Sequence, residues 1–253
     1  MRRRTVKTVG FFDPLPSVSE ELCDRYYTSV HVPLIVDVMR GMDISQTYHT
    51  AKAWFQRDPN GGWSQRSEVW RSVSIRVSIA EGSGPMPEAT RSAIEQDHRR
   101  FLSGLRTYLC REEIMCGNIR RHPPPTKFII EIGSSRGQFA SARSRVYGFK
   151  ETLGSILNRD GGVVLGIWNE VRCQERARTL DFPGQGFSPG EFISEPDAVA
   201  LVELYVEAAQ AGEEVINALQ PHLVALQGAP TVGAIRCFRF LEECQLEHSR
   251  PDD

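Results

Sequence analysis

The sequence lacks the features that mark several common classes of protein. Its 253 residues carry 30 lysines and arginines against 32 aspartates and glutamates, a formal net charge of −2. Without an overall positive charge, the chain has no field that would hold nucleic acid or an acidic membrane. No segment approaches the roughly 18 consecutive apolar residues of a membrane-spanning helix. These absences favour a cytoplasmic protein with no nucleic-acid partner and no membrane partner.

A signal peptide and paired metal-binding cysteines are also missing. The basic segment Met1–Arg4 is not followed by the apolar stretch that a secretory signal needs. The six cysteines form no Cys-x-x-Cys pair, and structural zinc usually takes its ligands in such close pairs. We therefore expect reduced thiols, and we expect no bound metal and no cofactor.

The first half of the chain contains alternating strand and helix patterns. Hydrophobic residues make up 40% of the chain and charged residues 25%, which is ordinary for a globular protein. Apolar spacing predicts strands over residues 5–12, 44–55 and 69–79, helices over 18–39 and 87–115, and a short strand near 118–121. Pro33 removes a backbone donor, so we expect it to distort the first helix near His31.

The second half repeats this order after the stiff segment His122–Pro125. Strands are predicted over 126–132, 163–172, 198–206 and 232–241, and helices over 139–156 and 211–223. A long loop, 173–196, and an acidic tail, 242–253, complete the chain. The order strand, helix, strand, strand, helix, strand thus occurs twice, which is the ferredoxin-like pattern. We predict an α+β protein with two tandem βαββαβ units, residues 1–122 and 123–253.

Residues 20–42 resemble a known family. The segment places Tyr26 and Tyr27 before His31, and then Val32, Pro33 and Leu34. This run is similar to the helix of the EthD-like family, a branch of the dimeric α+β barrel superfamily. The later segment Gln96–Phe101 is similar to the acidic, basic and aromatic patch on that family's second helix. The resemblance covers the first unit only, about residues 4–121.

The resemblance implies that each unit is a half-barrel, so that two units in one chain could build a whole barrel. Members of the superfamily commonly enclose a small hydrophobic or aromatic molecule, and some form homo-oligomers. They catalyse proton transfer, decarboxylation, dehydration, cyclisation or cofactor-free oxygenation, and some bind haem instead. The fold alone does not choose among these activities.

His31 is the leading catalytic candidate. Helical spacing places it on one face with Asp24 and Tyr27, and a carboxylate or phenol near an imidazole tunes a general acid or base near neutral pH. The alternative is a structural histidine that bonds the backbone carbonyls freed by Pro33. Arg76, on the polar face of a strand, is predicted to hold an anionic oxygen of the substrate.

Other residues are candidates for binding the substrate. Neighbouring residues of a strand face opposite sides of the sheet, so only one of the side chains of Tyr48 and His49 can face a cavity on a given side. The complete set of predicted substrate-binding residues is Tyr48, His49, Trp54, Trp70 and Trp168. Packing or surface roles remain the alternative for each of them. Asp97 and His98 could form a charge pair, but a solvated helix face is the favoured interpretation.

Two segments in the second unit have competing interpretations. Residues 131–137 form a Gly-containing turn between a strand and a helix, as in the nucleotide loops of methyltransferases. Two strands follow without an intervening helix, so a tight structural turn is favoured over a nucleotide site. Trp168, Asn169 and Glu170, together with arginines of the following loop, could line a second pocket or an interface.

From the sequence we therefore predict a cofactor-independent enzyme of the lyase or isomerase type that acts on an aromatic or hydrophobic substrate. His31 would be the general acid or base, assisted by Tyr27, Asp24 and Arg76. A cofactor-free monooxygenase on the same scaffold, or a non-catalytic ligand-binding or assembly protein, is the alternative.

Overall fold

The computed structural model describes residues 3–40, 44–64, 70–80, 87–118, 126–159, 162–178, 191–193 and 196–248. Within these ranges the chain contains two successive βαββαβ units, as predicted. Every strand pairing is antiparallel. In the described part of the chain, no helix is long and apolar enough to cross a membrane.

The first unit has its strands in the order β4-β1-β3-β2. Its strands are β1 (Arg3–Pro14), β2 (Ile44–Arg57), β3 (Arg71–Ala80) and β4 (Leu102–Gly117). One helical segment follows β1 and consists of α1 (Glu20–Tyr26), the π-helical turn η1 (Tyr27–His31) and α2 (Val32–Arg40). Helix α3 (Glu88–His98) connects β3 to β4. Ser19 caps α1, because its side chain accepts a hydrogen bond from the amide of Leu22.

The second unit repeats this strand order as β9-β5-β8-β6. Its strands are β5 (Thr126–Ser134), β6 (Val163–Arg178), β8 (Ala198–Val206) and β9 (Val232–His248), and the short β7 (Glu191–Ile193) adds to the edge of β6. Helices α4 (Phe139–Leu157) and α5 (Ala209–Gln227) complete it. The predicted turn after β5 is confirmed, and Gly137 adopts a positive φ of 71° within it.

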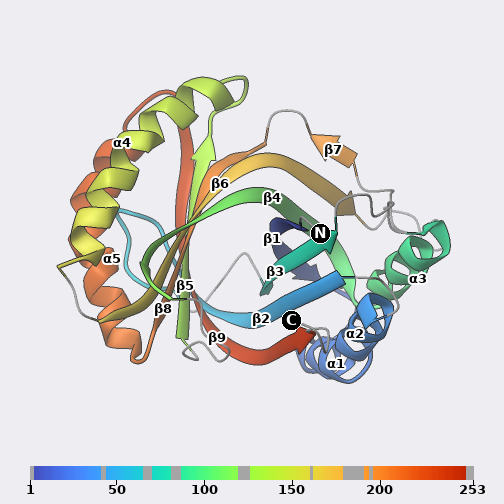
Figure 1. Cartoon of the computed structure of the whole chain (residues 1–253). Coiled ribbons are helices and arrows are strands. Elements are labelled where there is room, and N and C mark those ends of the chain that lie inside the picture. The colour runs from blue at the N-terminus through green and yellow to red at the C-terminus, as the bar shows by residue number, and fades with distance from the viewer. Residues whose placement is uncertain are drawn as a thin grey trace.

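The two units close into one barrel. β2 pairs with β9, and β4 pairs with β6, so eight of the strands form a closed antiparallel ring. Helices α4 and α5 lie outside the barrel on one side, and α1, α2 and α3 lie on the other (Figure 1). Closure removes the open strand edges that invite aggregation.

Each helical layer buries an apolar core against the outer face of the sheet. In the second unit, Val146, Leu153, Val215 and Leu219 pack against the outward side chains of β5 and β8. The spacing of these residues along their helices is the amphipathic pattern that predicted both helices. In the first unit the corresponding core is smaller and rich in aromatic residues.

One predicted helix is wrong over much of its length. The segment 87–115 was expected to be helical, but α3 ends at His98, and a turn leads into β4 at Leu102. In that turn the amides of Arg100 and Phe101 bond the carbonyls of Asp97 and His98. β4 forms because its main chain pairs on both sides, with β1 and with β6. This long-range pairing outweighs local helix propensity.

Two further segments differ from the prediction. Residues 242–248 of the expected acidic tail belong to β9, and the main chain of Gln46 pairs with that of His248. Two parts of the predicted loop 173–196 are strand, since β6 continues to Arg178 and β7 (Glu191–Ile193) pairs with it. The boundary that we expect between residues 122 and 123 lies outside the described residues and stays a prediction.

Candidate active site

The helix after β1 changes its winding just before His31. Tyr27–His31 form a π turn, in which the amide of Val32 bonds the carbonyl of Tyr27. Pro33 follows directly and has no amide hydrogen to donate, so the predicted distortion near His31 is confirmed. π turns inside α-helices often occur at functional sites. The turn directs His31 toward α3, where its partner lies.

His31 forms a buried pair with Asp97 of α3. Its Nδ1 lies 2.7 Å from Oδ2 of Asp97. The other carboxylate oxygen, Oδ1, accepts a hydrogen bond of 2.5 Å from the hydroxyl of Tyr26. Both oxygens of Asp97 are therefore engaged, and the carboxylate holds the imidazole in one orientation.

The electrostatics of this cluster favour an ionised Asp97 beside a neutral His98. Burial alone would raise the pKa of Asp97, but the hydrogen bonds from His31 and Tyr26 outweigh it, so that the pKa is lowered. Burial, assisted by the nearby His31, lowers the pKa of His98 to about 3. An ionised carboxylate can only accept, so Nδ1 of His31 donates to Asp97, which leaves Nε2 as the atom able to take a proton.

Aromatic rings enclose the imidazole of His31. The ring of Tyr27 lies 5.1 Å from it between centroids, and the rings of His98 and Phe101 both lie at 5.0 Å. His31 is 1% exposed. The imidazole thus sits in a largely apolar shell, with its polar contact to Asp97 on one side.

Asp24 and Trp70 lie in the same cluster and bond each other. Oδ1 of Asp24 accepts hydrogen bonds from Nη2 of Arg71 at 2.8 Å and from the indole N–H of Trp70 at 3.1 Å. The guanidinium of Arg71 stacks 4.5 Å above the ring of Tyr27. Asp24 therefore fixes Arg71 and Trp70, and Tyr27 links them to His31.

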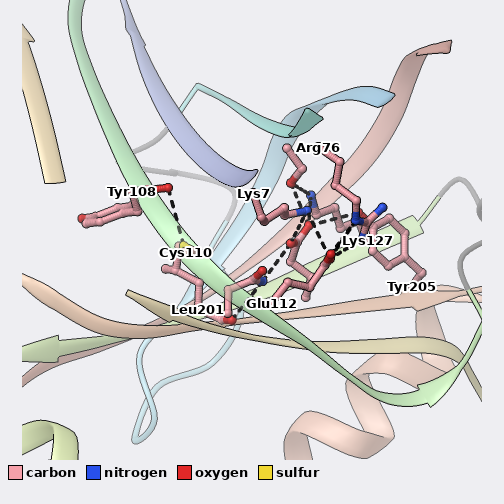
Figure 2. Close-up of polar contacts among 11 residues, drawn as sticks. Lys7, Arg76, Tyr108, Cys110, Glu112, Lys127, Leu201 and Tyr205 are labelled. Atoms are coloured by element: carbon pink, nitrogen blue, oxygen red, sulfur yellow. Dashed lines mark hydrogen bonds and ion pairs between the residues drawn. The ribbon is translucent and has the colours of Figure 1, made fainter. Parts of the chain in front are cut away.

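Arg76 is not brought to this cluster. β3 presents Val73 and Ile75 to the helical layer and Ser74 and Arg76 to the barrel interior. There the Nε of Arg76 donates to both oxygens of Glu112, at 2.9 and 2.6 Å. Figure 2 shows this pair inside the barrel, next to Lys7 and Lys127. The sheet thus separates Arg76 from His31.

The barrel interior holds a charged cluster that the sequence did not reveal. Lys7 and Lys127 reach Glu203 at 2.9 and 2.7 Å, and the hydroxyl of Ser74 also bonds Glu203, at 2.7 Å. Burial raises and the two lysines lower the pKa of Glu203, which ends well below its usual value. Glu203 interrupts the otherwise apolar strand Ala198–Val206, and that interruption is the signal that could have identified it.

The remaining candidates are scattered. Trp168 lies in the second unit, where it is buried against α4. Tyr48 and His49 belong to β2, opposite Ile75 and Ser74 of β3. The side chains of Tyr48, His49 and Trp54 lie outside the described part of the structure.

Asp97 is the residue of the candidate site that the sequence interpretation missed. Asp97 and His98 were expected on a solvated helix face, but they are only 6% and 9% exposed. The expectation failed because a short helix with mixed charges looks the same from its sequence whether or not another helix covers it. Here the segment Glu20–His31 covers α3 and supplies both partners of Asp97.

Comparison with known proteins gives a fold but no family. No family model and no curated protein sequence matches the chain. A proposed monooxygenase from Lactobacillus acidophilus NCFM aligns over 96% of this chain and 96% of its own, with a TM-score of 0.51 and 8% identity. An anthrone oxidase-like protein aligns over 98% of this chain and 94% of its own, with a TM-score of 0.52 and 8% identity.

A proposed monooxygenase from Fusobacterium nucleatum aligns over 99% of this chain and 100% of its own, with a TM-score of 0.51 and 10% identity. At identities this low the likeness shows the fold alone. The likeness covers nearly the whole chain, so the dimeric α+β barrel fold includes both units. The resemblance of the first half to the EthD-like family stays a prediction.

Proposed function

We propose that this chain is a small-molecule enzyme in which His31, held by Asp97, removes a proton from an aromatic or otherwise hydrophobic substrate. The observation that carries the proposal is the buried contact of 2.7 Å between Nδ1 of His31 and Asp97. A carboxylate that orients an imidazole and stabilises its protonated form is a recurring arrangement in general base catalysis. The EthD-like run around His31 supports the same assignment.

The surroundings of the pair suit a hydrophobic substrate. Tyr27, His98 and Phe101 surround the imidazole with rings that can pack against an aromatic molecule. Because His31 is 1% exposed, the helical layer has to open for a substrate to reach Nε2. Arg76 has no part in this proposal, since it lies across the sheet.

We favour oxygenation as the fate of the deprotonated substrate. A substrate such as anthrone has an acidic CH₂ group between two aromatic rings, and His31 would take one of its protons. The carbanion reduces molecular oxygen, one oxygen atom becomes a carbonyl oxygen on that carbon, and the other leaves as water. The monooxygenase and anthrone oxidase-like names among the structural neighbours support this choice, and the reaction needs no resident cofactor.

The alternatives share the fold and differ in the fate of the proton. In a lyase or isomerase, the carbanion would eliminate a group or be reprotonated elsewhere, without oxygen. A non-catalytic binding or assembly protein is a further alternative, and the nearly complete burial of His31 favours it. Measurement of oxygen uptake distinguishes the oxygenase from the lyase or isomerase. Turnover of any substrate distinguishes both enzymes from the non-catalytic protein.

The test is to replace His31 with Gln, which keeps a hydrogen bond to Asp97 and removes the base. With a panel of anthrone-like phenols and ketones, wild-type protein should consume one O₂ per product. The variant His31→Gln should turn over about 10²–10⁴ times more slowly at a nearly unchanged melting temperature.

His222→Gln is the matched control, because His222 is an exposed histidine on α5 and should not affect turnover. Product formation at full rate without oxygen would favour a lyase or isomerase. Unchanged turnover in a stable His31→Gln variant would exclude the catalytic role.

A further inference from the structure

A hollow lies between α4 and the seam where β4 pairs with β6. Helix α4 is on the opposite side of the barrel from α1 and α2 (Figure 1). Its cavity volume is about 90 Å³. A single water molecule needs roughly 10–15 Å³ of such cavity volume, so the hollow has room for a group of several heavy atoms. A more open trough continues from it toward Phe139 and Ser144.

Both units build the hollow. The first unit contributes Arg111 and Glu113 of β4, and the second contributes α4, Trp168 and Glu170 of β6, and Val199 of β8. The main chain of Arg111 pairs with that of Glu170 across the seam. The hollow therefore exists only in the closed barrel.

The charges of the hollow leave one cation without a counter-charge. Arg143 pairs with Glu170, and Lys150 lies 2.6 Å from a carboxylate oxygen of Glu113. Arg111 lines both the hollow and the trough, and no carboxylate within the described ranges pairs with it. Among the lining residues, three cations and two carboxylates thus leave one net positive charge. Arg172, outside the lining, also reaches Glu170 at 3.0 Å.

The inner wall of the hollow is apolar and aromatic. Val146 and Trp168 are buried there and belong to the core beneath α4. Tyr147 stands at the rim with 63% of its surface exposed, and Nζ of Lys150 lies 5.4 Å from its ring centroid. An exposed aromatic residue beside an uncompensated arginine is a combination that binds amphipathic anions.

We infer that this hollow is a binding site for a small organic monoanion, of the class of aromatic carboxylates. The ring would lie against Trp168 and Tyr147, and the carboxylate would accept hydrogen bonds from Arg111. The two existing ion pairs would border the ligand without being broken. This site is separate from the proposed reaction at His31 and does not depend on it.

The test uses benzoate as the probe and benzamide as its neutral analogue, titrated into the full chain by calorimetry. A charge-assisted hydrogen bond from Arg111 should make benzoate bind about tenfold more tightly than benzamide, or better. In Arg111→Gln this preference should disappear. Arg145→Gln is the matched control, because Arg145 is exposed on α4 and does not line the hollow.

The outcomes are distinct. Equal binding of the two probes, no binding of benzoate, or an unchanged preference in Arg111→Gln would overturn the inference. Loss of benzoate binding in His31→Gln with full binding in Arg111→Gln would overturn it as well, because the anion would then lie in the other unit. Failure of the oxygen-uptake test at His31 has no bearing on these results.

Discussion

At the residue scale, the candidate active site shows how burial changes the chemistry of a side chain. His98 follows Asp97 directly in sequence, yet burial favours the neutral form of His98, and hydrogen bonds favour the charged form of Asp97. The difference lies in the partners that each side chain meets after folding. Such differences also make stability depend on pH.

His98 should lower the stability of the protein in acid. Its pKa falls from 6.5 to about 3 on folding, so between these values the unfolded chain binds a proton that the folded protein does not. The free energy of unfolding should therefore decrease as the pH falls below 6.5, by up to about 1.4 kcal/mol per pH unit from this group. In His98→Phe this contribution should vanish. Urea unfolding of both proteins at several pH values measures it, and parallel profiles would contradict it.

At the element scale, the seam between β4 and β6 depends on a backbone conformation. Gly117, at the end of β4, has a φ of 74°, and a Cβ atom there would lie 1.9 Å from the carbonyl oxygen of Val164. Only glycine adopts that conformation readily and fits that space. Gly148, inside α4, has open space around it.

Substitution of these two glycines by alanine should therefore have opposite effects. Gly117→Ala should lower the free energy of unfolding by about 2–4 kcal/mol, from backbone strain and overpacking. Gly148→Ala should raise it by about 0.5–1 kcal/mol, because alanine loses less conformational entropy in a helix. Denaturant unfolding of the two variants measures both values. Equal effects would mean that β4 does not end against β6 in this way.

At the scale of the whole molecule, a cluster of buried charges joins the two units. Lys7 and Ser74 come from the first unit, and Lys127 and Glu203 from the second. Glu203 is the common acceptor of both lysines, and Glu112 lies 3.9 Å from Lys7. Buried ion pairs add little net stability, but the loss of one partner is costly.

Removal of Glu203 should therefore cost more than removal of either lysine. Glu203→Gln removes the carboxylate that both buried lysines contact and should destabilise the barrel by about 3–5 kcal/mol. Lys7→Met should cost less, because Glu203 keeps Lys127 at 2.7 Å. Thermal and urea unfolding of both variants test the order. A larger loss in Lys7→Met would show that Glu203 is not the centre of the cluster.

Most of the fold could be predicted from the sequence because its signals are local. The apolar spacing of α4 and α5 and the alternation of β3 identified their elements directly. Closure of the barrel could be predicted only from the family resemblance, since no local sequence pattern shows which strand edges pair. β4 was mistaken for helix for the same reason: its strand character comes from two partners far away in sequence.

The candidate site could be predicted only in part. Pro33 and the tyrosines marked His31, but Asp97 lies 66 residues further along, and only tertiary packing joins them. The sequence places Arg76 on the correct, polar face of its strand. That this face lines the barrel interior follows only from closure of the barrel, which the strand's own sequence does not indicate. Charges buried inside a barrel leave no periodic pattern, so Lys7 and Glu203 stayed undetected.

The pairing of β2 with β9 also has a consequence for how the protein is made. On the ribosome the first unit emerges with the edges of both β2 and β4 unpaired, and β6 and β9 are synthesised later. β9 is the last of the described strands of the barrel, so β2 keeps an open edge until β9 has been translated. During that interval the nascent chain exposes a surface on which other strands can pair. The barrel can therefore close at this edge only after β9 has left the ribosome.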